Sequence, residues 1–324
     1  MLGAGSWGTA LAIALASRFE SITLWARDPE RAVAIQGSRK NERYLKGFRL
    51  PGNVRVSSDL RYAAANAEIT LVVVPSQHLR RVLVKFTPWC PGDTKLVSAT
   101  KGIEETKLQR MSEVIAETLP GRPVAVLSGP TFAKEIAAGE PTAVVIASED
   151  LEFAGQVQHA FATPALRLYT SNDVIGVEVG AALKNVIAIG AGICRGMGLG
   201  SNSVAALVTR GLAEITRLAV AMGGNARTLS GLAGLGDLVL TTTGDLSRNR
   251  FVGMQLGKGR PLNQILAGMT MIAEGVGTCQ AAYVLGQRMN VDLPIIRKMH
   301  EILYEAKDPQ QAISELMERP LTIE

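Results

Sequence analysis

Apolar, β-branched runs alternate with amphipathic segments over the first half of the chain. The runs that we expect to form strands cover residues 22–26, 69–75, 95–99, 124–128, 142–147 and 166–170. Segments with a helical spacing of apolar residues separate them, and this alternation is typical of a parallel sheet with crossover helices. The pattern predicts an α/β fold whose N-terminal part is a Rossmann-like, doubly wound sheet.

The spacing of apolar residues changes after residue 170. Ser171, Asn172 and Asp173 form a helix N-cap motif, and the long Ala-, Leu- and Ile-rich segments that follow have a helical period without a convincing β-run. A chain of 324 residues is also long for one hydrophobic core. We therefore expect one domain over residues 1–170 and a second, all-helical domain over residues 171–324.

Gly3, Gly5 and Gly8 form a G-x-G-x-x-G motif directly before an Ala- and Leu-rich helical segment. In dinucleotide-binding folds the first two glycines allow a tight turn beside the pyrophosphate, and the third lets the helix pack on its strand. Only two residues precede the motif, so we expect that roughly five to ten residues of the carrying strand lie before this numbering. The motif predicts that the first domain binds a dinucleotide.

Arg27 follows the next expected strand, about 20 residues after the glycine motif, where a side chain selects the cofactor. An acidic residue there binds the ribose 2′-hydroxyl, whereas a guanidinium group suits a 2′-phosphate. The sequence therefore favours NADP(H). NAD(H) stays an alternative, because Asp28 is adjacent and because Arg27 can equally be a solvent-facing charge.

Lys184 lies among small apolar residues near the start of the expected helical domain. Burial disfavours an ammonium ion and lowers the pKa of a lysine toward neutrality, which a general acid or base needs. The sequence thus indicates Lys184 as a proton-transfer residue. The alternative is a lysine whose stem covers apolar surface while its ammonium group reaches solvent.

Ser247 and Arg248 precede a helix that we expect from residue 251. An anion at this helix start would meet free N–H groups, the helix dipole and the guanidinium of Arg248, so the segment suits a phosphate; the alternative is a polar connector with an ordinary capping serine. Two further polar segments, 98–102 and 127–135, follow expected strands, where ligands collect in open α/β sheets. Each of these can also be ordinary loop chemistry.

The charge balance and the cysteines exclude several other classes of protein. The net charge is only +5, and the basic run over residues 39–49 has few interleaved aromatic residues, Tyr44 among them, so we expect a solvated face and no nucleic-acid partner. The three cysteines and three histidines are scattered, which predicts no disulfide framework, no metal and a reducing cytoplasm. Lys184, Arg195 and Arg210 interrupt the apolar middle of the chain, so we expect no membrane span.

In chain order, one set of motifs resembles the bacterial-type NAD(P)-dependent glycerol-3-phosphate dehydrogenases over essentially the whole chain. The motifs are G-A-G-S-W-G-T-A, L-W-A-R-D, N-E-R-Y-L-K-G, A-T-K-G, S-G-P-T-F-A-K-E, A-L-K-N-V-I-A-I-G-A-G, G-L-G-D-L and S-R-N-R. Lys46 departs from the pattern, since relatives commonly have proline there. The resemblance implies hydride transfer between sn-glycerol 3-phosphate and dihydroxyacetone phosphate, by a cytoplasmic homodimer that supplies glycerophospholipid synthesis.

The resemblance also implies roles for individual residues. Lys184 would transfer the proton at the substrate carbinol, and Asn185 would orient Lys184 or the substrate. The substrate-binding residues would be Lys101, Gly129, Thr131, Lys184, Asn185, Asp237, Ser247, Arg248 and Asn249. The cofactor-binding residues would be Gly3, Gly5, Ser6, Trp7, Gly8, Arg27, Lys101, Ala133, Arg248, Ile272 and Glu274. The rival interpretations are a β-hydroxyacid or ketopantoate reductase, and a dinucleotide-binding sensor without catalysis.

Overall fold

The computed structural model describes residues 1–65 and 67–321 and divides the chain into two compact units. Unit 1 comprises Met1–Lys101 and Gln109–Glu178, and unit 2 comprises Gly102–Leu108 and Val179–Glu324. The expected boundary at residue 170 differs from this division in two places. Residues 102–108 belong to the second unit, and residues 171–178 belong to the first. The helix Val174–Gly196 therefore begins in unit 1 and continues into unit 2.

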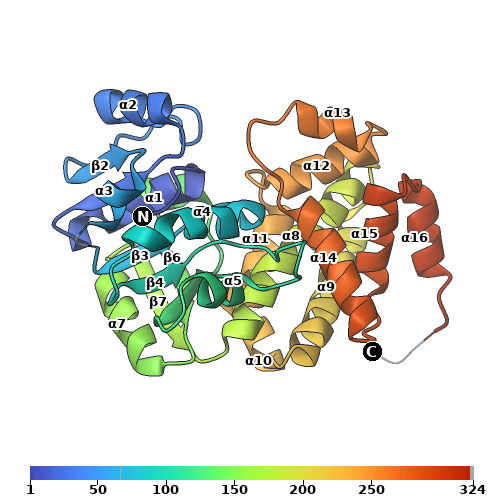
Figure 1. The fold of residues 1–324 in the computed structure, drawn as a ribbon. Coiled ribbons are helices and arrows are strands. Elements are labelled where there is room, and N and C mark those ends of the chain that lie inside the picture. The colour runs from blue at the N-terminus through green and yellow to red at the C-terminus, as the bar shows by residue number, and fades with distance from the viewer. Residues whose placement is uncertain (66, 322–324) are drawn as a thin grey trace. The chain divides into compact units, whose positions relative to one another are not determined.

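The strands of unit 1 form a two-stranded and a five-stranded part of a sheet (Figure 1). They are β1 (Ile22–Trp25), β2 (Val54–Ser57), β3 (Ile69–Val72), β4 (Lys95–Ser98), β5 (Val124–Ser128), β6 (Thr142–Ala147) and β7 (Leu166–Ser171). β1 pairs with β2, and the other five pair in the order β3-β4-β5-β6-β7. β2 was missing from the expected strands, because its four residues include an exposed arginine and a serine and so form no apolar run.

All strand pairs are parallel except β5 and β6, so the expectation of a wholly parallel sheet is wrong at that pair. The helix between these two strands, α6 (Ala133–Ala138), has six residues. Such a helix spans about 9 Å, whereas a six-residue strand spans about 20 Å. α6 thus covers less than half the length of the strand that follows it, and β6 runs in the opposite direction to β5.

Leu2 connects the two parts of the sheet. It forms parallel bridges to Trp25 of β1 and to Val72 of β3. Its N–H donates to the Leu71 carbonyl, and its own carbonyl accepts from the N–H of Val73, both at 2.8 Å. The short segment before the glycine motif therefore occupies the central position between β1 and β3, as the first strand of a Rossmann fold does.

Helices cover both faces of this sheet. The helices of unit 1 are α1 (Ser6–Leu15), α2 (Pro29–Ser38), α3 (Leu60–Ala64), α4 (Leu79–Phe86), α5 (Met111–Thr118), α6 and α7 (Leu151–Phe161), with 3₁₀ turns at Ala16–Arg18, Ser76–His78 and Thr87–Trp89. Neighbouring residues of β4 belong to two different hydrophobic cores: Val97 lies in the one that includes Leu11 of α1, and Leu96 lies in the one that includes Phe86 of α4. The predicted doubly wound α/β arrangement is thus confirmed.

Unit 2 contains only helices among its described residues. They are α8 (Val174–Gly196, begun in unit 1), α9 (Ser201–Ala221), α10 (Ala226–Leu229), a π-helical turn (Leu232–Gly236), α11 (Asp237–Thr243), α12 (Arg248–Gly257), α13 (Leu262–Ala267), α14 (Gly275–Arg288), α15 (Pro294–Tyr304) and α16 (Pro309–Met317). The predicted N-cap of α8 is confirmed, because the Asp173 carboxylate accepts a 2.8 Å hydrogen bond from the N–H of Gly176.

By length and composition α8 could cross a membrane, which the interrupting charges had led us not to expect. The charged residues of this helix are Glu178, Lys184 and Arg195. However, 94% of the 18-residue apolar stretch of α8 is buried inside the protein. Protein side chains therefore surround this helix in the fold, as they surround the core helix of a globular domain.

Candidate active site

The glycine motif adopts the shape that a bound pyrophosphate requires. Gly3 has a φ of 118°, and a Cβ there would lie 2.5 Å from the Val73 carbonyl oxygen. A Cβ on Gly8 would lie 1.9 Å from the Gly3 oxygen, whereas one on Gly5 would point into open space. No side chain caps the N-terminus of α1, which begins directly after Gly5. The turn thus leaves room for an anion beside helix N–H groups, so these residues fit a dinucleotide.

Asn41 braces this loop, and sequence reasoning assigned it no role. Its buried amide nitrogen donates to the Ala4 carbonyl at 3.0 Å and to the Thr9 hydroxyl at 2.8 Å. The only signal in the sequence was its place at the head of the N-E-R-Y-L-K-G motif. Ser6 and Trp7, both expected to bind the cofactor, are the first two residues of α1.

Arg27 is exposed just after β1, where a side chain can select the cofactor. Its neighbour Asp28 is already engaged at the start of α2. The Asp28 carboxylate accepts from the N–H of Arg31 at 3.2 Å and forms a 3.4 Å ion pair with the guanidinium of the same residue. The acidic group that kept NAD(H) open therefore acts as a helix cap in this structure.

Lys101, Gly129 and Thr131 lie together in unit 1. The Lys101 ammonium group donates to the Gly129 carbonyl at 3.1 Å and to the Thr131 hydroxyl at 3.2 Å. Gly129 has a φ of 147°, and a Cβ there would lie 3.0 Å from the Cα of Val144, so a side chain would be both strained and crowded. These residues follow the carboxyl ends of β4 and β5, and Ala133 begins α6 just beyond them.

Lys184 lies in the middle of α8 with a side chain only 7% exposed. Its ammonium group donates to Oδ1 of Asp237 and, at 3.0 Å, to the hydroxyl of Thr241. Asp237 is fully buried, so its carboxylate compensates the ammonium charge where little water can do so. The alternative of a lysine with its ammonium group in solvent is therefore wrong.

The position of Asp237 results from tight backbone packing. It follows the π-helical turn Leu232–Gly236, a kind of irregularity that is frequent at functional sites. A Cβ on Gly180 of α8 would lie 2.8 Å from the Ala233 oxygen, so the turn approaches α8 closely. Thr241 is one helical turn after Asp237 and donates to its backbone oxygen at 2.6 Å, which leaves the hydroxyl oxygen to accept from Lys184. The sequence showed a run of threonines here but did not single out Thr241.

Asn185 and Asn249 form a second buried contact beside Lys184. The Asn249 amide nitrogen donates to the Asn185 side-chain oxygen at 2.9 Å, and the Asn249 oxygen accepts from the N–H of Gly275 at 3.0 Å. A Cβ on Gly275 would lie 2.6 Å from the Asn185 carbonyl oxygen. α8, α12 and α14 therefore meet at this point, and the two amides are held in fixed orientations.

Glycines bring α12 against α8. A Cβ on Gly253 would lie 1.8 Å from the Ile189 oxygen, and one on Gly257 would lie 2.4 Å from the Ile193 oxygen. Gly192 of α8 is equally close to the backbone of α12. Since the two backbones touch, the first turn of α12 is fixed next to the turn of α8 that carries Lys184.

Ser247 caps α12, since its hydroxyl oxygen accepts from the N–H of Arg250 at 3.2 Å, and the helix begins at Arg248 and not at the expected residue 251. The guanidinium of Arg248 donates to the Ile272 carbonyl at 3.0 Å and interacts electrostatically with Glu274. Arg248 and Ile272 are both exposed. Three residues expected to contact the cofactor are thus neighbours within unit 2.

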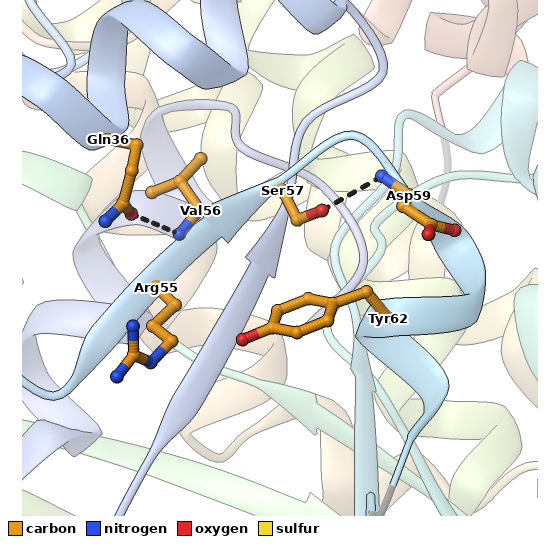
Figure 2. Close-up of a pocket in the computed structure, with 6 residues that line it drawn as sticks. All are labelled: Gln36, Arg55, Val56, Ser57, Asp59 and Tyr62. Atoms are coloured by element: carbon orange, nitrogen blue, oxygen red, sulfur yellow. Dashed lines mark hydrogen bonds between the residues drawn. The ribbon is translucent and has the colours of Figure 1, made fainter.

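Figure 2 shows a hollow beside β2 that contains none of the expected site residues. Its lining residues are Gln36, Arg55, Val56, Ser57, Asp59 and Tyr62. The Gln36 side-chain oxygen accepts from the N–H of Val56 at 2.8 Å, which occupies a donor on the outer edge of β2.

Within residues 1–65 and 67–321, no group of three or more His, Cys, Asp or Glu residues is arranged to hold a metal ion.

Comparison with known proteins agrees with this arrangement. The models of the N-terminus and C-terminus of NAD-dependent glycerol-3-phosphate dehydrogenase match residues 1–154 and 173–314. A glycerol-3-phosphate dehydrogenase (NAD(P)+) of Koribacter versatilis is 53% identical, covering 100% of this chain and 98% of the relative. One of Syntrophotalea carbinolica is 51% identical with the same coverage.

Among solved structures, that of glycerol-3-phosphate dehydrogenase from Coxiella burnetii has a TM-score of 0.95 at 39% identity and covers 98% of each chain. A ketopantoate reductase from Ralstonia eutropha has a TM-score of 0.63 at 19% identity, covering 96% of this chain and 100% of that chain, and therefore shares the fold alone. The two family models and the relatives that match over the whole chain agree, and the chain belongs to the NAD-dependent glycerol-3-phosphate dehydrogenase family.

Proposed function

We propose that this chain interconverts dihydroxyacetone phosphate and sn-glycerol 3-phosphate with NADP(H) as its preferred cofactor, and that Lys184 transfers the proton. The observation that carries the proposal is the buried contact of Lys184 with Asp237 and Thr241, inside the half of the chain that matches the family's C-terminal model. The product would supply glycerophospholipid synthesis. The nicotinamide, when bound, supplies or accepts the hydride at C2 of the substrate.

Lys184 acts at the substrate oxygen on C2. In the reducing direction its ammonium group donates a proton to this oxygen as negative charge develops there, and in the oxidising direction the neutral amine removes the hydroxyl proton. A positioned acid or base of this kind contributes about 10²–10⁴-fold to the rate. Asp237 and Thr241 hold the Nζ atom in place, and Asn185 and Asn249 bind the substrate beside it.

The phosphate group of the substrate binds at the start of α12. There Ser247 and Arg248 combine free helix N–H groups with a guanidinium, which suits a dianion. In unit 1, Lys101, Gly129 and Thr131 contribute further contacts to the substrate. The Lys101 ammonium group lies within hydrogen-bonding distance of the Gly129 carbonyl and the Thr131 hydroxyl, at a position where only glycine fits, and this supports the role.

The cofactor binds at the glycine turn, with its pyrophosphate at the N–H groups of Ser6 and Trp7. Lys101, Ala133, Arg248, Ile272 and Glu274 complete its binding residues. Arg27 binds the 2′-phosphate of NADP(H), since it is exposed after β1 while Asp28 is engaged as a cap. The active protein is a homodimer in the cytoplasm and needs no metal.

The decisive assay compares the oxidation of NADPH and NADH with dihydroxyacetone phosphate as the sole acceptor. We expect turnover with both cofactors and a higher kcat/KM with NADPH. Arg27→Ala should raise the KM for NADPH about tenfold to a hundredfold, the loss of one charge-assisted contact, and leave the KM for NADH nearly unchanged. Arg55→Ala, which removes another exposed arginine of unit 1, is the matched control.

Two results would overturn these proposals. No turnover of dihydroxyacetone phosphate with either cofactor would remove the proposed reaction. A wild-type enzyme that prefers NADH, or an Arg27→Ala variant with an unchanged KM for NADPH, would remove Arg27 as the selecting residue. Full activity after exhaustive treatment with a chelator tests the absence of a metal, and sedimentation tests the homodimer.

A further inference from the structure

A second buried charged group lies on α8, one and a half turns before Lys184. Glu178 is only 4% exposed. Its carboxylate accepts hydrogen bonds from the N–H of Ser112 at 2.7 Å, from the Ser112 hydroxyl at 2.6 Å and from the guanidinium of Arg110 at 2.7 Å. Burial raises the pKa of Glu178, and the charge of Arg110 together with the Ser112 bonds opposes that rise.

The partners of Glu178 are themselves held rigidly. Arg110 is the N-cap residue of α5, and its N–H donates to the Glu113 carboxylate at 2.8 Å while its guanidinium binds the other Glu113 oxygen at 2.9 Å. The guanidinium also donates to the Ser112 hydroxyl at 3.0 Å. Glu178 is therefore bound to a helix start that other contacts already fix.

The place of these residues along the chain is the second observation. Arg110 lies just after the point at which the chain returns from unit 2 to unit 1, and Glu178 is the last residue before the chain leaves unit 1 for unit 2. Lys101, a proposed substrate residue, immediately precedes the segment Gly102–Leu108 that belongs to unit 2. One ion pair thus joins two of the three points at which the chain passes between the units.

We propose that Glu178 is a positioning residue for the dehydrogenase reaction: by binding Arg110 and Ser112 it fixes the first turns of α8 and so the location of the Lys184 ammonium group. The inference rests on the proposed function of Lys184. Lys184 is the sixth residue after Glu178, about 9 Å along a helix whose backbone hydrogen bonds make both turns move together. Proton transfer is sensitive to such movement, since a displacement of about 1 Å can cost about 10²-fold in rate.

The test is Glu178→Gln, which keeps the shape of the side chain but presents an amide N–H₂ group to the donors of Arg110 or Ser112. We expect kcat for dihydroxyacetone phosphate reduction, counted per NADPH-binding site, to fall about tenfold to a hundredfold. The Kd for NADPH should stay within about twofold, because the hydrogen bonds of Glu178 are to the start of α5 and not to the glycine turn. Glu178→Asp, which keeps the charge, should recover part of the loss.

The matched control is Glu113→Gln, which alters the other carboxylate bound to Arg110 without removing Glu178. It should leave kcat nearly unchanged. Hydride transfer from deuterated NADPH gives a further readout, because displacement of Lys184 slows the chemical step and should raise the isotope effect on kcat. If Glu178→Gln does not fold, Ser112→Ala removes one of the three contacts and should give a smaller change in the same direction.

The inference is overturned if Glu178→Gln has a normal kcat per binding site and a normal isotope effect, even when it is less stable. It is also overturned if Glu113→Gln lowers kcat as much as Glu178→Gln does. These outcomes are distinct from a failure of the proposed function, which would appear as absence of dihydroxyacetone phosphate reduction by the wild-type protein.

Discussion

The buried pair of Lys184 and Asp237 makes a quantitative prediction. The two side chains are 7% and 0% exposed, so neither charge can be compensated by water when the other is removed. Breaking such a pair by removing one partner typically costs about 3–5 kcal/mol. Against a total stability of about 5–15 kcal/mol, this is large enough to measure and small enough for the variants to fold. We expect Lys184→Met and Asp237→Asn each to lose this amount.

The double variant distinguishes the pair from two independent residues. Lys184→Met combined with Asp237→Asn contains no buried charge at either position, so its loss should be close to that of one single variant. The coupling free energy should therefore be about as large as one single loss, about 3–5 kcal/mol, at or above the upper end of the range for residues in contact. Both single variants should also lose most of their activity, because each disturbs the proton-transfer group.

Urea unfolding followed by circular dichroism is the appropriate assay for this cycle. All three tryptophans, Trp7, Trp25 and Trp89, belong to unit 1, whereas Lys184 and Asp237 belong to unit 2. Tryptophan fluorescence recorded in parallel shows whether the units unfold together. The reasoning would be refuted if the two single losses simply added in the double variant, or if each were below about 1 kcal/mol.

Two further predictions concern stability. Burial raises the pKa of Glu214, which accepts from the N–H groups of Ile295 and Ile296, to about 7. In the unfolded chain this carboxyl group releases its proton near pH 4.3. The free energy of unfolding of the wild type should therefore fall by up to about 3 kcal/mol between that pH and 7, relative to that of Glu214→Gln. Urea unfolding at pH 5 and 8 checks this prediction, and equal pH dependences of the two proteins would contradict it. Gly253→Ala places a Cβ 1.8 Å from the Ile189 oxygen and should cost at least about 1–3 kcal/mol in thermal unfolding, whereas Gly155→Ala, in open space on α7, should not destabilise.

The features that sequence reasoning predicted correctly depend on neighbours in the chain. The N-caps at Asp173 and Ser247 require a side-chain oxygen two or three residues before a helix N–H, and the structure has both. The glycine motif is equally local, since the clash that each side chain would cause arises within the turn and the strand beside it. Such signals can be found by inspection of a short window.

The features that it missed depend on contacts between distant residues. Asp237 is 53 residues from Lys184, so no local pattern identifies it as the partner of the ammonium group. Asn41 lies 37 residues from the carbonyl that it binds in the glycine loop. The reversal of β6 appears only in its pairing with β5, because an apolar run of residues indicates a strand but not the direction in which it pairs.

The composition of α8 shows how the site constrains the fold. The helix is apolar enough to resemble a membrane span because the protein surrounds it, and its glycines are needed where α12 and the π-helical turn touch its backbone. A charged residue in such a helix is tolerated only with a partner of opposite charge. Glu178 has Arg110, and Lys184 has Asp237. Each buried charge on α8 thus fixes the helix to a different neighbour, and the residue proposed to move the proton is held between those two attachments and the close contact with α12.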